Sequence, residues 1–263
     1  MRRRVAILGA TGSIGGQALD VISQHAEDFD VVALACGRQT SAAAALAAAY
    51  PSAELRIGGD ASALAELVSA SEPHLVVVAT NGLVALPATI AALDGGAAVA
   101  IANKETIVAA GELVMAAARR AAEAARSTPL ERLRPVDSEH SALWQCLNGE
   151  DPARVDQLWL TASGGPFRTW DVERIAAALP PDALNHPTWS MGAKITVDSA
   201  SLVNKGLEAI EAQRLYGVPM ERVKILVHPE SVVHALVTYR DGSTIAQLRS
   251  EEHTSELQSH LKS

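Results

Sequence analysis

The sequence has few aromatic residues and little cysteine. Phe, Trp and Tyr make up 3% of the 263 residues, so a core must be built mostly from Ala, Val, Leu and Ile. Two cysteines, Cys36 and Cys146, are too few for a disulfide framework or a thiolate zinc site, and they fit a reducing compartment. Met1-Arg2-Arg3-Arg4 leads into an apolar run that is too short for a signal peptide or a membrane span. We therefore expect a cytoplasmic protein.

Positive charge is also scarce. The chain has 22 basic and 30 acidic residues, for a formal net charge of −8. Nucleic acids and anionic membranes both favour a basic surface, so neither is expected as a partner. Hydrophobic residues at 48% and charged residues at 20% are typical of a globular protein, and the length allows two ordinary domains or one large α/β domain.

The first half of the chain alternates short apolar runs with Ala-rich helical stretches. This alternation predicts a parallel sheet covered on both faces, as in a Rossmann-type domain. The long Ala/Arg helix ends before Pro129, which places the domain at residues 1–126. Strands are expected at 5–8, 31–35, 55–57, 75–79 and 97–101, with helices at 15–24, 41–49, 61–70, 83–93 and 106–125.

The second half has a different rhythm. Asp241-Gly242 is typical of a hairpin turn between two antiparallel strands, which predicts an α+β domain over residues 127–248. Residues 249–263 show neither helical nor strand periodicity and are expected to form a disordered polar tail. The strands expected in this half are 155–161, 223–227, 232–239 and 244–248.

A glycine-rich turn follows the first predicted strand. Gly9, Gly12 and Gly15 open the first predicted helix, where backbone amides and the helix dipole can bind a pyrophosphate. Their spacing differs from G-x-G-x-x-G, so a tight turn that binds nothing is the alternative. The strand–turn–helix setting favours a nucleotide site.

The residues after the second predicted strand indicate which nucleotide. An NAD site has an acidic residue there to bind the ribose hydroxyls, whereas this chain has Gly37-Arg38-Gln39. Arg38 suits a 2′-phosphate, so NADPH is preferred. The alternative is that Arg38 is a solvated surface residue.

Acidic residues in the second half suggest a metal site. Asp137 and Glu139 would lie on one side of an extended segment and suit Mg²⁺ or Mn²⁺, although such a pair is usually a solvated loop. Helical spacing would place Ser201, Lys205 and Glu208 on one face. This pattern predicts either a surface ion pair or, with Ser199 and Asn204 beside it, a phosphate-binding cluster.

The segment Trp189-Ser190-Met191-Gly192 has the Pro and Gly punctuation of a loop. Its apolar side chains could cover a bound ligand, as a lid does. The alternative is a loop whose Trp fills a groove in the core.

Taken in order, these motifs resemble the 1-deoxy-D-xylulose 5-phosphate reductoisomerase family, over residues 4 to 248. The resemblance implies rearrangement of 1-deoxy-D-xylulose 5-phosphate and its reduction by NADPH to 2-C-methyl-D-erythritol 4-phosphate, with Mg²⁺ or Mn²⁺, in the non-mevalonate route to isoprenoids. It also implies a homodimer. The motifs are GATGSIG, ANKE, PVDSEHSA, SGGPF, HPTWSMGAKITVDSASLVNKGLE and HPESVVH.

The resemblance also implies roles for individual residues. The metal ligands would be Asp137, Glu139 and Glu208, with Lys104, His186 and His234 as further catalytic residues. Substrate contacts would be Lys104, Ser138, Glu139, Ser163, His186, Trp189, Met191, Ser199, Asn204, Lys205 and Glu208. Cofactor contacts would be Gly9, Thr11, Gly12, Ser13, Ile14, Gly37, Arg38, Gln39, Asn103, Glu105 and Gly206.

The sequence departs from the family pattern after Leu248. The family continues there with a Gly-Pro-Asp-Met-Arg run and a helical carboxy-terminal domain, whereas this chain continues with Arg249-Ser250-Glu251. We therefore expect that domain to be absent. An inactive fragment that keeps only NADPH binding is one alternative. The other is a metal-independent dehydrogenase of the semialdehyde or homoserine type.

Overall fold

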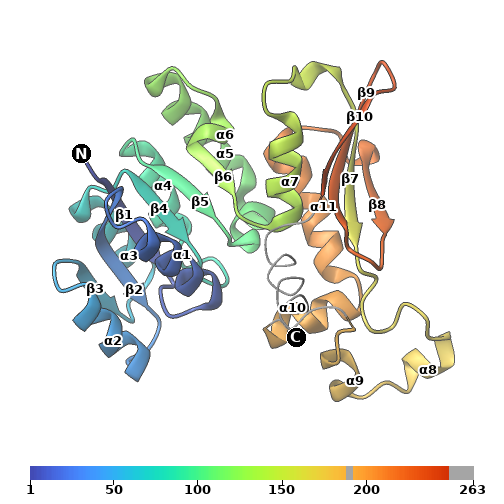
Figure 1. Cartoon of the computed structure of the whole chain (residues 1–263), viewed down its shortest axis with the longest axis horizontal. Helices are drawn as coiled ribbons and strands as arrows, with labels where there is room; N and C mark the ends of the chain where they lie inside the picture. Colours follow the sequence, from blue (N-terminus) through green and yellow to red (C-terminus); the bar gives the residue numbers. More distant parts are fainter. Residues whose placement is uncertain (188–191, 249–263) are drawn as a thin grey trace, which may run out of the picture. The chain divides into compact units, whose positions relative to one another are not determined.

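The computed structural model describes residues 1–187 and 192–248. It divides into two compact units, Met1–Asp137 and Ser138–Ser263 (Figure 1). The domain ranges expected from the sequence, 1–126 and 127–248, remain a prediction. No helix within the described residues is long and apolar enough to span a bilayer.

The first unit is built on a six-stranded sheet in the order β3-β2-β1-β4-β5-β6. Every neighbouring pair is parallel, which confirms the Rossmann-type sheet. The succession of strands reverses between β1 and β4. The strands are β1 (Arg3–Leu8), β2 (Phe29–Cys36), β3 (Glu54–Ile57), β4 (Leu75–Val78), β5 (Ala98–Ile101) and β6 (Leu133–Pro135).

Helices cover the two faces of this sheet because right-handed crossovers change face where the strand order reverses. Leu19 and Ile22 of α1 pack with Val5 and Ile7 of β1 on one face. The helices are α1 (Ser13–Gln24), α2 (Ser41–Ala49), α3 (Ala61–Ser71), α4 (Leu86–Asp94), α5 (Lys104–Ala125) and α6 (Pro129–Arg132).

The second unit has a mixed four-stranded sheet in the order β10-β9-β7-β8. The strands β9 and β10 pair antiparallel across the predicted hairpin, and β7 pairs antiparallel with β9 but parallel with β8. The α+β prediction is confirmed. The strands are β7 (Val155–Ala162), β8 (Val223–Val227), β9 (Val233–Tyr239) and β10 (Thr244–Leu248).

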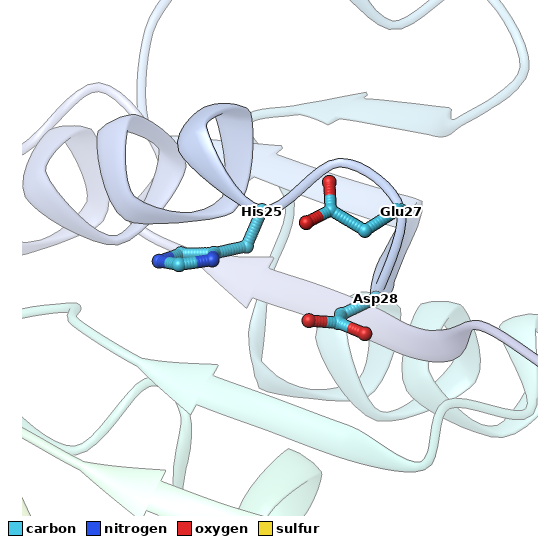
Figure 2. Close-up of side chains that lie close together, drawn as sticks. All are labelled: His25, Glu27 and Asp28. Atoms are coloured by element: carbon cyan, nitrogen blue, oxygen red, sulfur yellow. The ribbon is translucent and has the colours of Figure 1, made fainter.

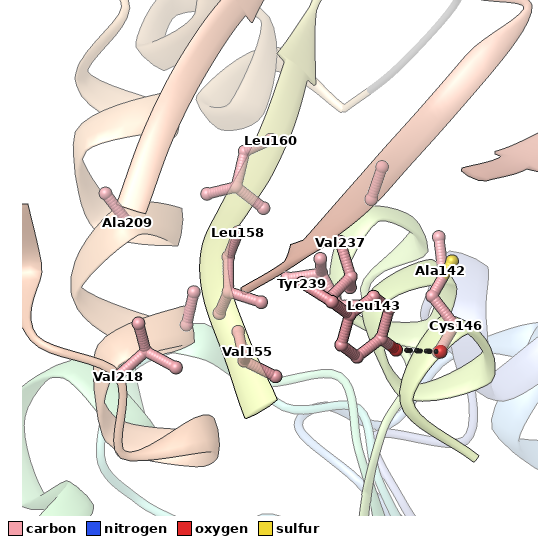
Figure 3. Packing of buried hydrophobic residues seen from close by; sticks show 12 residues of the cluster. Ala142, Leu143, Cys146, Val155, Leu158, Leu160, Ala209, Val218, Val237 and Tyr239 are labelled. Carbon is pink, nitrogen blue, oxygen red and sulfur yellow. Dashed lines mark hydrogen bonds between the residues drawn. The ribbon is translucent and has the colours of Figure 1, made fainter. Parts of the chain in front are cut away.

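One face of this sheet packs against two helices. Leu158 and Leu160 of β7 contact small and branched side chains from α7 and α11, including Ala209 (Figure 3). The hydroxyl of Tyr239 donates to the carbonyl of Cys146, 2.9 Å away, and ties β9 to α7. The helices of the unit are α7 (Ser138–Leu147), α8 (Val172–Ala176), α9 (Pro180–Leu184), α10 (Ala193–Ala200) and α11 (Val203–Tyr216), with two 3₁₀ turns, Pro152–Arg154 and Met220–Arg222.

Candidate cofactor and metal sites

The glycine turn between β1 and α1 is closely packed. Gly9 has a φ of +90°, and a Cβ built on it would lie 2.4 Å from the carbonyl oxygen of Ala79. A Cβ on Gly15 would lie 2.3 Å from the carbonyl oxygen of Gly9. Both positions therefore require glycine, because any side chain would collide with backbone atoms.

The first turn of α1 has the features of an anion site. Gly12 is the N-cap, and among the described residues no side chain caps this helix and no acid lies in its first turn. Thr11, Ser13 and Ile14 are exposed around it. Amide hydrogens and the positive end of the helix dipole are thus available to a pyrophosphate, so the residues present fit the predicted nucleotide.

The loop after β2 lies next to this turn, since β2 pairs with β1. Gly37, Arg38 and Gln39 are exposed there, and Thr40 accepts from the amide of Ala43 to cap α2. An exposed guanidinium at the end of the second strand fits the 2′-phosphate of NADPH better than a bare ribose.

The start of α5 contributes three of the predicted residues. Asn103 is the N-cap of α5 and is 1% exposed. Lys104 forms an ion pair with Asp137, with Nζ 2.8 Å from Oδ2. Glu105 lies in the first turn of the helix and is half-buried.

In the second unit, α7 and α11 bring two carboxylates together around an ammonium group. Nζ of Lys205 lies 2.9 Å from Oε1 of Glu139 and 2.5 Å from Oε2 of Glu208. Burial alone would lower the pKa of Lys205, but the two carboxylates outweigh it and raise this pKa well above its usual value. The ammonium therefore stays charged, and it neutralises part of the repulsion between the carboxylates.

Neighbouring side chains orient these carboxylates. Asn204 donates from Nδ2 to Oε1 of Glu208 at 2.5 Å, and the Ser138 hydroxyl donates to Oε2 of Glu139 at 2.8 Å. Glu208 is 1% exposed. The sequence of residues 201–208 predicts either a surface ion pair or a phosphate-binding cluster. The surface ion pair is wrong, because Lys205 and Glu208 are buried.

Asp137 precedes this group directly in the chain. Only Ser138 separates Asp137 from Glu139 in the sequence, so connectivity keeps these two carboxylates close. An all-oxygen set of carboxylates fits Mg²⁺ or Mn²⁺.

Two local expectations for this region are wrong. The segment at Glu139 is not extended, because α7 begins at Ser138. Ser201 does not share a helix with Lys205, because the helical backbone is interrupted at Leu202, whose φ is +59°. Ser201 is instead the exposed C-cap of α10.

Two buried residues behind the carboxylates were not assigned a role from the sequence. Nε2 of His140 lies 2.9 Å from the carbonyl oxygen of Glu208, and Nδ1 lies 3.7 Å from Oε2 of Glu211. His140 is fully buried and Glu211 is 1% exposed. The available signal was spacing, since Glu211 follows Glu208 by one helical turn and His140 follows Glu139 directly.

Three of the predicted substrate-binding residues, Ser163, His186 and Ser199, lie in separate segments of the second unit. The hydroxyl of Ser163 lies 3.1 Å from Nε2 of His186. Gly165 (φ +68°) packs so closely on α10 that a Cβ would lie 2.5 Å from the carbonyl oxygen of Ser199. Burial, and then the nearby Arg168 charge, hold the pKa of His186 below its usual value.

The remaining predicted residues are placed as follows. His234 is buried on β9, and its carbonyl accepts from the hydroxyl of Thr161 at 2.8 Å. Gly206 lies in α11 of the second unit, with no atom within 4 Å of a Cβ built on it, among the described residues. Trp189 and Met191 lie outside the described residues.

A separate group of metal-ligand side chains lies at the surface of the first unit. Figure 2 shows His25, Glu27 and Asp28 in the turn that joins α1 to β2. Their ligand atoms lie within 4.8 Å of one another, but all three residues are exposed. A solvated turn explains this group without a metal.

Comparison with known proteins decides which family these two units represent. Residues 5–60 and 39–111 match the model of 1-deoxy-D-xylulose 5-phosphate reductoisomerase, and residues 133–216 match the model of its C-terminal domain. The reductoisomerase of Desulfitobacterium hafniense is 42% identical over 265 residues, which cover 93% of this chain and 67% of that protein. The chain belongs to the 1-deoxy-D-xylulose 5-phosphate reductoisomerase family.

A second curated reductoisomerase is also similar to this chain in sequence. The reductoisomerase of Mycobacterium leprae (strain Br4923) is 47% identical over 260 residues, which cover 94% of this chain and 62% of that protein. This chain thus spans about two thirds of the length of the curated relatives.

Solved reductoisomerase structures are also similar to this chain. The Zymomonas mobilis reductoisomerase in complex with NADPH matches with a TM-score of 0.81 and 39% identity, covering 95% of this chain and 68% of that one. A reductoisomerase in complex with NADPH, fosmidomycin and magnesium matches with a TM-score of 0.83 and 36% identity, covering 94% and 66%.

Proposed function

We propose that this chain catalyses the family reaction, the NADPH-dependent rearrangement and reduction of 1-deoxy-D-xylulose 5-phosphate to 2-C-methyl-D-erythritol 4-phosphate. The observation that carries the proposal is the arrangement in the second unit in which the buried Lys205 ammonium joins the carboxylates of Glu139 and Glu208. The product would feed isoprenoid synthesis by the non-mevalonate route.

The carboxylates would hold a divalent cation. When bound, that cation supplies positive charge to the carbonyl and hydroxyl oxygens of the substrate, and NADPH supplies hydride. Mg²⁺ is supported by the magnesium complexes of similar structures, and Mn²⁺ suits the same oxygen set. The proposed ligands are Asp137, Glu139 and Glu208.

The chain's own residues would bind and orient the substrate. Hydroxyl, amide and ammonium groups are suitable donors to a phosphate, and holding it fixed would keep the rearranging fragments in register. The proposed substrate-binding residues are Lys104, Ser138, Ser163, His186, Trp189, Met191, Ser199, Asn204 and Lys205. His234 would be a further active-site residue.

The cofactor would bind at the carboxyl ends of β1 and β2. The exposed first turn of α1 would bind the pyrophosphate, and Arg38 the 2′-phosphate. NADPH complexes of similar structures support this choice. The proposed contacts are Gly9, Thr11, Gly12, Ser13, Ile14, Gly37, Arg38, Gln39, Asn103, Glu105 and Gly206.

A metal-independent dehydrogenase is a weaker alternative, because it would leave the three carboxylates with no metal to bind.

We further propose that the protein is a cytoplasmic homodimer. Light scattering after size exclusion tests that state: a mass of twice 27.5 kDa supports it, and a monomeric mass contradicts it.

Substrate-dependent oxidation of NADPH tests the proposed function. The chain should oxidise NADPH only when both 1-deoxy-D-xylulose 5-phosphate and Mg²⁺ or Mn²⁺ are present. Glu208→Gln should lower the rate by about 100-fold or more, because it removes a ligand charge. Activity that survives a chelator would point to the metal-independent dehydrogenase. No turnover with intact NADPH binding would point to the inactive fragment.

A further inference from the structure

The chain contains the dipeptide Asn-Gly twice, at Asn81-Gly82 and at Asn148-Gly149. An asparagine before glycine is especially prone to lose its side-chain amide, because glycine has no Cβ to hinder attack by its own backbone nitrogen. All four residues are exposed. Residue type and exposure therefore do not separate the two pairs, and any difference in their chemistry must come from the surrounding backbone.

Asn148-Gly149 lies in a tight turn directly after α7. The amide of Glu150 donates to the carbonyl of Leu147 at 3.1 Å across this turn. Gly149 has a φ of +85°, and a Cβ built on it would meet no described atom within 4 Å. Within the part of the chain that the structure describes, no group accepts a hydrogen bond from the amide of Gly149. The nitrogen that must react is therefore available, in an exposed residue.

Asn81-Gly82 is held on both sides. The side chain of Asn103 donates from Nδ2 to the carbonyl oxygens of Thr80 and Gly82, each at 2.7 Å. These bonds fix the peptide groups that flank Asn81. Attack on the side chain requires the asparagine backbone to rotate until the next nitrogen reaches Cγ, and the two bonds resist this rotation.

We propose that Asn148 is a site of spontaneous covalent modification, converted to aspartate and isoaspartate in the folded chain, whereas Asn81 is protected. The backbone nitrogen of Gly149 bonds to Cγ of Asn148, and the bond from Cγ to the side-chain nitrogen breaks. The proton lost by the backbone nitrogen leaves with the departing group as ammonia. Water then adds to either carbonyl carbon of the resulting succinimide ring and opens it, so no oxidant or reductant is needed.

The product places a new carboxylate beside the C-terminal end of α7. The last carbonyls of a helix carry partial negative charge, so an added anion there is unfavourable. Glu150 and Asp151 follow directly and add to the repulsion. The helix α7 carries Glu139 in its first turn. Modification at residue 148 should therefore lower the stability of the helix that supplies this carboxylate.

Timed peptide mapping of the full chain tests the proposal. The folded chain is kept in mildly alkaline buffer, digested at intervals and analysed by liquid chromatography and mass spectrometry. The peptide that contains residue 148 should convert to two acidic products at least about ten-fold faster than the peptide that contains residue 81, because local opening limits the second reaction. Asn148→Gln should stop conversion at 148, since the longer side chain disfavours the ring, and should leave the rate at 81 unchanged.

The same measurement in denaturant is the matched control. The two peptides should then convert at similar rates, because the fold no longer separates them. Equal rates in the folded chain would overturn the proposal, and so would modification of the folded chain at residue 81 alone or at neither pair. A preference for 148 that persists in denaturant would assign it to neighbouring side chains and overturn the protection of Asn81. The test needs neither substrate nor NADPH, so its result is independent of the proposed function.

Discussion

Nζ of Lys205 lies 2.9 Å from Oε1 of Glu139, although the two residues are 66 positions apart in the chain. The same ammonium contacts Glu208 on its own helix. A buried cation that joins a buried and a half-buried carboxylate stabilises the fold only as a complete group, because removing one charge leaves the others uncompensated.

Lys205→Met should therefore destabilise the second unit by about 3–5 kcal/mol, measured by denaturant unfolding in the presence of a chelator. When Mg²⁺ replaces the chelator, part of this loss should be recovered, since a divalent cation can replace the missing positive charge. Lys194→Met is the control, because its pair with Asp198 is largely exposed and should be worth less than about 1 kcal/mol. Equal losses in the two variants would contradict the account.

Two adjacent glycines in α1 should respond oppositely to alanine. Gly15→Ala should destabilise the first unit by about 1–3 kcal/mol and weaken NADPH binding, because the new Cβ meets the Gly9 backbone. Gly16→Ala should stabilise it by about 0.5–1 kcal/mol, because a Cβ there meets no described atom within 4 Å and alanine favours helix. Thermal unfolding and NADPH titration measure both effects. Equal tolerance of the two changes would disprove the close packing of the turn.

Neither cysteine should react with thiol reagents in the folded chain. Cys36 and Cys146 are 2% and 4% exposed, and burial raises the pKa of both thiols. A chromogenic disulfide at mildly alkaline pH should label them only after denaturation. Ser62→Cys, at an exposed position of α3, should add one fast-reacting thiol. Fast labelling of the unaltered chain would show that the core around Cys36 or the core around Cys146 is accessible to the reagent.

His186 should remain neutral at pH values where an ordinary histidine gains a proton. Burial and Arg168 lower its pKa below 6.5, so the unfolded chain binds this proton at a higher pH than the folded chain does. The contribution of His186 to stability is therefore complete above pH 6.5 and decreases as the pH falls below that value.

Titration of the His186 ring by NMR should thus give a midpoint below 6.5, with His186→Gln used to assign the signal. The same variant should show less loss of stability between about pH 7 and about pH 5 than the unaltered chain. A midpoint above 6.5 would contradict the described surroundings of this ring.

The parallel sheet could be predicted because its buried strands form short apolar runs between Ala-rich helices. The strand β6 (Leu133–Pro135) could not, since three residues carry no periodicity. The start of α7 at Ser138 was also missed, because Asp-Ser-Glu is equally compatible with an extended segment. In the site, the clustering of Lys205 with Glu208 followed from helical spacing, whereas the turn at Leu202 has no glycine or proline to indicate it.

The burial of the site could not be predicted from spacing. A Lys three residues before a Glu has the same spacing on an exposed helix, and only the packing of α7 against α11 brings Glu139 to Lys205. The hydrogen bonds from Asn103 to the carbonyls of Thr80 and Gly82 were hidden for a similar reason, because these partners lie more than twenty residues earlier.

The most direct test is to incubate this chain with 1-deoxy-D-xylulose 5-phosphate, Mg²⁺ and NADPH that carries deuterium at the transferred position. The expected product is 2-C-methyl-D-erythritol 4-phosphate with a single deuterium at its new alcohol carbon, detected by mass spectrometry and NMR. Asp137→Asn should form almost none. Absence of this product from a chain that binds both NADPH and Mg²⁺ would contradict the proposed function.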